Sequence, residues 1–174
     1  SNSELTKRLK AKKALSKATF TADDPKKLAG EIREAHQVGG LTLVVVNTVK
    51  KAVAVYAALK MLMQPVPKRG KKGVVEQTPL APPPDILLLH SRFRPPERQA
   101  KMQQLEQFAK TGGIVISTQV VEAGVDMSAR VMFTELSPWA SFVQRVGRCN
   151  RYGEFTKGAE VFWIEVDSQK AAPY

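Results

Sequence analysis

The chain has 174 residues, which is enough for one domain with a full hydrophobic core and short for two. Its hydrophobic content of 43% is typical of a soluble globular fold, and no apolar run approaches the length that spans a membrane. The single cysteine, Cys149, excludes an internal disulfide and a cysteine-rich zinc site, and the basic first residues do not resemble a secretion signal, so we expect a cytoplasmic protein.

Positive charge dominates the composition. Lysine and arginine number 27 against 16 aspartates and glutamates, which gives a formal net charge of +11. An excess of this size favours polyanionic partners, because cationic side chains displace the counterions that surround phosphates. Basic proteins without such partners exist, so the charge favours nucleic acid without requiring it.

The first 23 residues are expected to form a basic linker or helix ahead of the main domain, which we place at 24–174. Residues 4–17 are compatible with a helix and rich in lysine, with a thin apolar stripe that includes Leu5 and Leu9. Such a helix could connect to a preceding domain or lie along nucleic acid. A solvated terminus explains the same composition equally well.

A helix opens the main domain. Asp24 suits its N-cap and Pro25 its first helical position, and the pair Gly39 and Gly40 is expected to end it. We expect His36, near the end of this helix, to be a helix-terminal residue rather than a ligand.

A buried strand is predicted next, from the run LTLVVV at 41–46, and is followed by a helix at about 49–63. Asn47 and Thr48 lie between them, at the carboxyl end of the strand. One of the two is expected to cap the helix, which does not exclude a contact with a ligand at the same position.

Residues 64–85 are the least foldable part of the chain. They contain six prolines and the basic run KRGKK. A structureless link of this length is uncommon inside a compact domain and is usually functional or disordered. We interpret it as a mobile surface insertion with a potential electrostatic contact to DNA.

Regular structure is expected again at 86–89, a short buried strand that ends at His90. Pro96 and Glu97 suit the first turn of the helix that follows. A metal site at His90 is disfavoured, because only one other histidine occurs and no cysteine or carboxylate stands at ligand spacing. The loop carries three candidates for phosphate contact: Arg92, Arg94 and Arg98.

The most informative stretch runs from 113 to 151. Short apolar runs at 114–116 and 131–133 predict strands buried on both faces of a parallel sheet, where ligands gather at the carboxyl ends of the strands. We expect the polar residues of the stretch at that edge: Ser117, Thr118, Glu122, Asp126 and Glu135. Three arginines close it, and their planar donor forks suit phosphate oxygens: Arg145, Arg148 and Arg151.

Together with a last strand at 159–166, strands alternate with helices along the chain, which predicts right-handed crossovers and a parallel sheet. The sequences TQVVEAGVDM (118–127) and QRVGRCNR (144–151) resemble motifs V and VI of superfamily 2 helicases. This resemblance implies a RecA-like three-layer α/β domain, the second of the two that form a helicase motor.

Within that superfamily, the chain most resembles the CRISPR-associated helicase-nuclease of type I systems, over about residues 29–166. The segments that carry the resemblance are VVVNT, LLLHSRF, STQVVEAGVDM, the loop at Ser137 and Pro138, and QRVGRCNR. RNA-unwinding DEAD-box proteins usually have histidine where Gln144 stands, and the stretch 123–125 is closer to the general superfamily pattern than to the commonest CRISPR form. Two alternatives stay open: a catalytically silent nucleic-acid-binding or scaffold domain, and the corresponding domain of a DNA-repair helicase.

The resemblance implies roles on a nucleotide side and a nucleic-acid side. Arg148 and Arg151 would be arginine fingers that reach the γ-phosphate across a domain interface, and Gln144 would orient them or the attacking water. Asp126 would accept a hydrogen bond from the ribose, and Gly124 would let the backbone approach the nucleotide. The residues expected to face the nucleic-acid strand are Asn47, Thr48, His90, Ser91, Arg92, Arg98, Thr118 and Gln119.

The implied cofactor is ATP with Mg²⁺, bound mainly by a first RecA-like domain, because this chain has neither a GxxxxGK[ST] phosphate loop nor an acidic DExH-type box. The implied partners are that first domain, single-stranded DNA and a CRISPR effector complex, with no membrane. Arg145 is expected to brace the domain interface, and Gln119 and Glu122 to couple the two sites. The HD nuclease that the CRISPR family also carries is not in this sequence.

Overall fold

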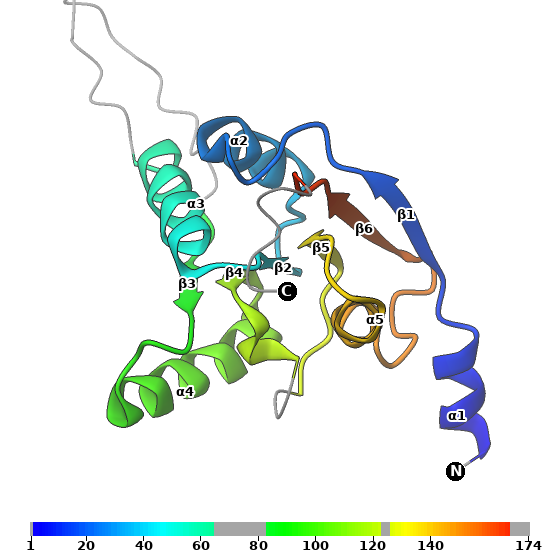
Figure 1. Cartoon of the computed structure of the whole chain (residues 1–174). Coiled ribbons are helices and arrows are strands. Elements are labelled where there is room, and N and C mark those ends of the chain that lie inside the picture. The colour runs from blue at the N-terminus through cyan, green and yellow to red at the C-terminus, as the bar shows by residue number, and fades with distance from the viewer. Residues whose placement is uncertain (1, 65–82, 123–125, 168–174) are drawn as a thin grey trace, which may run out of the picture.

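Six parallel strands form the centre of the fold, in the order β1-β6-β5-β2-β4-β3 (Figure 1). The structure is a computed structural model that describes residues 2–64, 83–122 and 126–167. Every neighbouring pair of strands is parallel. The strands are β1 (Lys13–Lys17), β2 (Leu41–Val45), β3 (Ile86–Leu89), β4 (Gly113–Ser117), β5 (Val131–Glu135) and β6 (Ala159–Ile164).

Apolar side chains fill both faces of the sheet centre. All residues of β2, β4 and β5 are buried. Within β2, Val44 belongs to one hydrophobic cluster, whereas Leu43 and Val45 belong to the other. This alternation follows from the pleat, which points successive side chains to opposite faces. The unbroken β-branched runs in the sequence therefore mark strands that are covered on both sides, as predicted.

Helices cover the two faces and complete three layers. Figure 1 shows α2 (Pro25–Ala35) and α3 (Val49–Leu62) on one side, and α4 (Pro95–Thr111) and α5 (Trp139–Val146) on the other. Leu28 and Leu59 belong to the cluster on the first face, and Leu105 to the cluster on the second. The terminal helix α1 (Asn2–Leu9) precedes β1, and a 3₁₀ turn, η1 (Gln119–Val121), follows β4.

Two helix starts have the predicted caps. The carboxylate of Asp24 accepts a hydrogen bond from the backbone N–H of Lys27 at 3.3 Å, and Pro25 is the first residue of α2. The hydroxyl of Thr48 accepts from the N–H of Lys51 at 3.3 Å, so Thr48 is the residue that caps α3. Each cap satisfies one of the backbone donors that a helix start leaves unpaired.

The helix expected over 4–17 is wrong in its second half. Lys13–Lys17 is a strand, β1, which pairs with β6 so that Leu15 lies beside Val161. Four of its five residues are exposed, because it lies at the edge of the sheet. An exposed edge strand has no strict alternation of apolar residues, and its lysines suit an edge that must not pair with another chain.

The glycine pair after α2 has a different role from the one predicted. Helix α2 ends at Ala35, with His36 as its C-cap, before the pair is reached. Gly39 has a φ of 75°, and Gly112, with a φ of 85°, packs against it so closely that a Cβ on Gly112 would lie 2.7 Å from the carbonyl carbon of Gly39. These glycines therefore allow two backbone turns to touch beside the starts of β2 and β4.

Two large apolar residues are not fully buried. Leu62, the last residue of α3, is 41% exposed. The aromatic ring of Trp163 in β6 is half-buried and lies 5.4 Å from the amine of Lys17. Most of the proposed insertion lies outside the described residues, so its role stays a prediction. Among the described residues, no helix is long and apolar enough to cross a membrane.

Candidate nucleotide and nucleic-acid site

A buried carboxylate, Glu135, organises the end of β5. One of its oxygens accepts a hydrogen bond from the backbone N–H of Asn47 at 2.6 Å, and the other lies 2.6 Å from the amine of Lys51 in the first turn of α3. Its side chain is 0% exposed, so the lysine and the N–H supply the partners that a buried charge requires. The junction between β2 and α3 is thereby tied to the end of β5.

Arg145, from α5, contacts the backbone of the same glutamate and is 0% exposed. Its Nε donates to the carboxylate of Glu122 at 2.7 Å, and its Nη1 donates to the amide oxygen of Asn47 at 3.0 Å and to the carbonyl of Glu135 at 3.2 Å. One guanidinium therefore joins the segments that follow β2, β4 and β5. Arg145 braces this domain from within, which differs from the interface role that the resemblance implied.

Glu122 connects this network to the arginines further along the chain. Its carboxylate binds Arg145, while its carbonyl accepts a hydrogen bond from Nη2 of Arg148 at 2.9 Å. On the other side, the amide of Gln119 donates to the carbonyl of Asn47 at 3.1 Å. Gln119 and Glu122 are thus in physical contact with both groups of residues that they were expected to couple. The coupling itself stays a prediction.

Arg148, Arg151 and Asp126 form a second cluster. The Nε of Arg151 lies 3.3 Å from the carboxylate of Asp126, and the hydroxyl of Tyr152 donates to the same carboxylate. Burial lowers the pKa of Arg148, and the neighbouring charge of Arg151 adds to this effect. Two positive charges that are held close enough to repel each other suit a polyanionic ligand.

Backbone pairing fixes where these arginines stand. The N–H of Ala129 donates to the carbonyl of Arg148 at 2.8 Å, and the N–H of Asn150 donates back to the carbonyl of Ala129 at 2.9 Å. The N–H of Arg151 donates to the hydroxyl of Ser128 at 2.8 Å. The loop after α5 is therefore fastened to the residues that lead into β5.

The position of Asp126 corrects one prediction. It was expected at the carboxyl edge of the sheet with Ser117 and Glu135. Instead, the chain between β4 and β5 returns toward the start of β5, and Asp126 lines a cavity of about 340 Å³ together with Gly39 and Leu41, which lie at the start of β2. The polar residues of the stretch thus divide between the two edges, and the carboxylate of Asp126 is 76% exposed.

Three of the predicted nucleic-acid contacts are largely buried. Thr118 is 2% exposed, Asn47 is 3% exposed and His90 is 8% exposed. The side-chain amide of Asn47 is engaged within the chain, since it donates to the carbonyl of Leu136 at 2.8 Å and accepts from Arg145. Thr48 is half-buried under its capping hydrogen bond. Contact between these residues and nucleic acid stays a prediction.

The remaining candidates are more accessible. Ser91, Arg92 and Arg98 are exposed on the loop after β3 and the first turns of α4, and Gln144 is exposed on α5. The ring of His90 stacks on Phe93 at a centroid distance of 4.0 Å. Burial lowers the pKa of His90, and the charges of Lys101 and Arg92 add to this effect, so the ring is neutral at neutral pH.

Two residues of the site, Lys51 and Tyr152, were not predicted from the sequence. Lys51 gave no signal, because a lysine in the first turn of a helix is usually solvated. Tyr152 directly follows the arginine motif, and only its contact with Asp126 reveals a role. Gly124, expected near the nucleotide, lies outside the described residues. Among the described residues, no group of three histidine, cysteine, aspartate or glutamate side chains is placed to hold a metal ion.

Comparisons with known proteins give the site its context. Residues 38–154 match the Cas3-like C-terminal family, described as the C-terminal part of the CRISPR-associated nuclease/helicase Cas3. A CRISPR-associated nuclease/helicase Cas3 of Haloferax volcanii is 33% identical over 112 residues, or 61% of this chain and 12% of that protein. The CRISPR-associated helicase Cas3 of Thermoproteus tenax is 31% identical over 147 residues, or 81% of this chain and 21% of that protein.

Solved structures show the same fold. The crystal structure of T. fusca Cas3-ATP matches with a TM-score of 0.60 at 24% identity, covering 94% of this chain and 19% of that one. The C-terminal domain of the DEAD-box protein Dbp5 also matches with a TM-score of 0.60, at 18% identity, covering 92% of this chain and 79% of that domain. The three-layer α/β fold is therefore that of RecA-like helicase C-terminal domains, and the chain spans about an eighth to a fifth of the two curated relatives described above.

Proposed function

The chain belongs to the Cas3-like family of helicase C-terminal domains, and from this premise we propose that it is the second motor domain of an ATP-dependent DNA helicase of CRISPR type I interference. In this proposal it supplies arginine fingers to a nucleotide held mainly by a first RecA-like domain. It also supplies contacts to the backbone of single-stranded DNA, and the complete protein meets a CRISPR effector complex.

The observation that carries the proposal is the cluster of Arg148 and Arg151 beside Asp126. Phosphoryl transfer spreads negative charge over the γ-phosphate oxygens, so cations aimed at them stabilise the transition state more than the ground state. Arg148 is anchored by the carbonyl of Glu122 at 2.9 Å, and Arg151 by the carboxylate of Asp126 at 3.3 Å. Such anchoring reduces the reorganisation that each guanidinium needs when phosphate oxygens arrive.

Asp126 has two tasks in this account. Without nucleotide it neutralises Arg151 and accepts from Tyr152. With nucleotide its exposed carboxylate would accept from the ribose, while Gly124 leaves room for the backbone to approach. Gln144, exposed on α5, is placed on the same helix as Arg145 and would orient the fingers or the attacking water.

The nucleic-acid face is proposed at the carboxyl ends of β2, β3 and β4. Arg92 and Arg98 are exposed there and can neutralise phosphates without any change in the fold. The buried Asn47, Thr118 and His90 would act through the backbone that they hold, and Thr48, Ser91 and Gln119 border them. Glu122 joins this face to Arg148, which supports communication between DNA and nucleotide.

The absence of a phosphate loop and an acidic box in the sequence leads to a direct test. With ATP, Mg²⁺ and single-stranded DNA, the purified chain should hydrolyse no more ATP than an Arg148→Ala, Arg151→Ala variant prepared in parallel. The variant serves as the control for a contaminating ATPase. DNA-stimulated turnover that occurs in the wild-type chain and vanishes in the variant would contradict the half-site proposal.

A further inference from the structure

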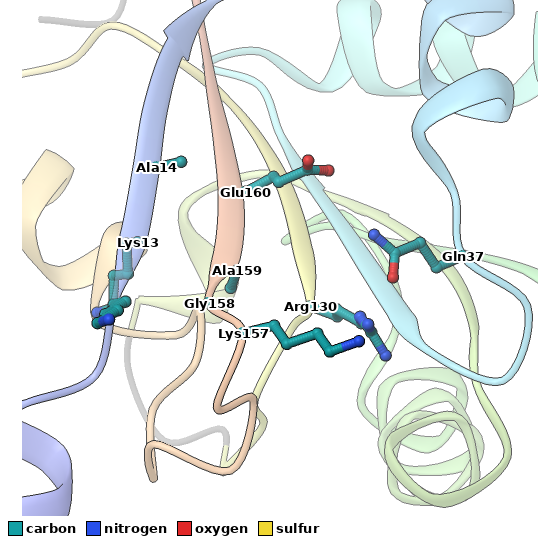
Figure 2. A pocket seen from close by; sticks show the side chains of 9 residues that line it. Lys13, Ala14, Gln37, Arg130, Lys157, Gly158, Ala159 and Glu160 are labelled. Carbon is teal, nitrogen blue, oxygen red and sulfur yellow. The ribbon is translucent and has the colours of Figure 1, made fainter.

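A second cavity, with a lining different from that of the cavity beside Asp126, lies at the edge of the sheet where strands begin. It has a volume of about 430 Å³ and lies beside the first residues of β1, β5 and β6 and the loop after α2. Figure 2 shows its lining from close by. Its polar lining residues are Lys12, Lys13, Gln37, Arg130, Lys157 and Glu160.

Most of the charge around this cavity is positive and uncompensated. Four of these residues are cationic and only Glu160 is anionic. Neither Arg130 nor Lys157 has a carboxylate within ion-pair distance among residues 2–64, 83–122 and 126–167. Lys13 is turned away, because its amine donates to the carbonyl of Val146 at 3.0 Å. Three cationic side chains of the lining thus remain for a ligand: Lys12, Arg130 and Lys157. The last two lie close to each other in Figure 2.

Arg130 has an unmet hydrogen-bonding requirement. Its Nε is buried and has no hydrogen-bond partner among the described residues. Its guanidinium lies 5.6 Å from the centre of the Phe155 ring, and Phe155 lines the cavity that holds Asp126. A buried donor without an acceptor costs free energy. Turning the guanidinium toward an oxygen acceptor in the cavity would remove this cost.

The donors approach from three different segments. Arg130 lies directly before β5, where its N–H donates to the carbonyl of Leu41 at 2.9 Å. Lys157 lies in the turn before β6, and Gln37 lies in the loop after α2. In Figure 2 the amine of Lys157 points toward the guanidinium of Arg130, and the side chains of Gln37 and Glu160 extend toward one another. The backbone of Arg130 accepts from the N–H of Glu160 at 3.1 Å, which fixes the two strands in register.

We propose that this cavity binds a phosphate group, with Arg130, Lys157 and the amide of Gln37 as donors and Glu160 accepting from a hydroxyl or amine of the molecule that carries it. A tetrahedral phosphate offers oxygens in several directions, whereas a carboxylate offers two in one plane, so donors from three segments fit phosphate better. The volume exceeds that of a bare phosphate and leaves room for the attached group. The proposal does not depend on the function of Arg148 and Arg151.

The test compares two variants of equal net charge. Arg130→Gln, Lys157→Gln removes the two cationic donors that the proposal names, and Arg33→Gln, Lys110→Gln removes two exposed charges from α2 and α4. Pyrophosphate is titrated into isotope-labelled chain and followed by NMR at the Nε–H of Arg130 and the side-chain amide of Gln37. Both signals should move in the wild type. Affinity should fall by about tenfold or more in the first variant, because each lost bond to a charged group is worth about a factor of ten, and stay within about twofold in the second.

Unchanged affinity in the first variant would overturn the proposal, as would pyrophosphate shifts confined to Arg148 and Arg151. If the double variant does not fold, as judged by thermal unfolding, Lys157→Gln alone carries the test, because Lys157 is exposed. Tetraglutamate that binds more tightly than pyrophosphate would assign the cavity to carboxylates and contradict phosphate.

The source of the phosphate is resolved by a second titration. A short oligothymidylate that moves the Arg130 and Gln37 signals, and competes with pyrophosphate, identifies the ligand as a nucleic-acid backbone. Pyrophosphate binding without that competition identifies a free phosphate compound. Either result supports the phosphate site, and neither bears on the arginine fingers, whose failure would show in turnover and not in these signals.

Discussion

Replacing Arg145 by alanine should destabilise the domain more than any exposed substitution. The guanidinium is fully buried and makes hydrogen bonds of 2.7, 3.0 and 3.2 Å to three different segments. Its removal leaves the carboxylate of Glu122, which is only 13% exposed, without its cation, and leaves the amide oxygen of Asn47 without a donor. Breaking a buried ion pair from one side costs about 3–5 kcal/mol.

That loss is large compared with the stability of a typical domain, which is about 5–15 kcal/mol. For a chain of this size each kcal/mol corresponds to about 2–4 °C in Tm, so the expected decrease is about 6–20 °C. Arg145→Lys should recover little of it, because one amine cannot reproduce the three bonds of the planar fork. Arg33→Ala on the exposed face of α2 is the matched control, with an expected change within about 0.5 kcal/mol.

The assay is urea and thermal unfolding of each variant of the 174-residue chain, followed by circular dichroism. A double-mutant cycle with Glu122→Gln isolates the pair, and a coupling of about 0.5–3 kcal/mol is expected for groups in contact. If Arg145→Ala lowers Tm no more than Arg33→Ala does, Glu122 and Asn47 find other partners in solution. The internal network would then not hold the site together.

Two further predictions concern DNA and the thiol. If about four phosphates are neutralised, the logarithm of the single-strand binding constant should fall with the logarithm of salt concentration at a slope near −3. Fluorescence anisotropy measures this slope, and the double variant Arg92→Gln, Arg98→Gln should make it shallower. Salt-independent binding would exclude recognition of the DNA backbone. Burial raises the pKa of Cys149 to about 12, so at pH 8 only about one thiol in ten thousand is the reactive thiolate. Ellman's reagent should therefore label the folded chain far more slowly than the chain in denaturant, and equal rates would show that Cys149 is not buried in solution.

The sequence predicted the sheet centre well because its strands are covered on both faces. Runs such as 41–46 and 114–116 are apolar at nearly every position, so they fit only strands that are buried on both faces. The edge strand Lys13–Lys17 could not be found in this way. Its exposed lysines and single pairing partner leave a composition that suits a helix equally well.

The candidate site, like the sheet, could be predicted only in part. Arg148 and Arg151 could be proposed as site residues from the sequence, because the motif that contains them is local. The burial of Arg145 could not be foreseen, since its partners Asn47 and Glu135 lie 98 and 10 residues away in the chain. The displacement of Asp126 from the strand-end edge likewise depends on contacts between distant segments, such as those of Ser128 and Ala129 with the loop after α5, which no local pattern specifies.

The central claim is that Arg148 and Arg151 act on the nucleotide, and it is tested most directly in the full-length parent protein, where the first motor domain is present. Turnover number and Tm are measured on the same preparations of wild type, Arg148→Ala, Arg151→Ala and Arg151→Lys. Arginine fingers are worth about 10³–10⁵ in rate, so ATPase activity should collapse in both alanine variants, and lysine should rescue little, while Tm and single-strand affinity stay nearly unchanged. A near-normal kcat in both alanine variants, or a loss that follows Tm alone, would contradict the account.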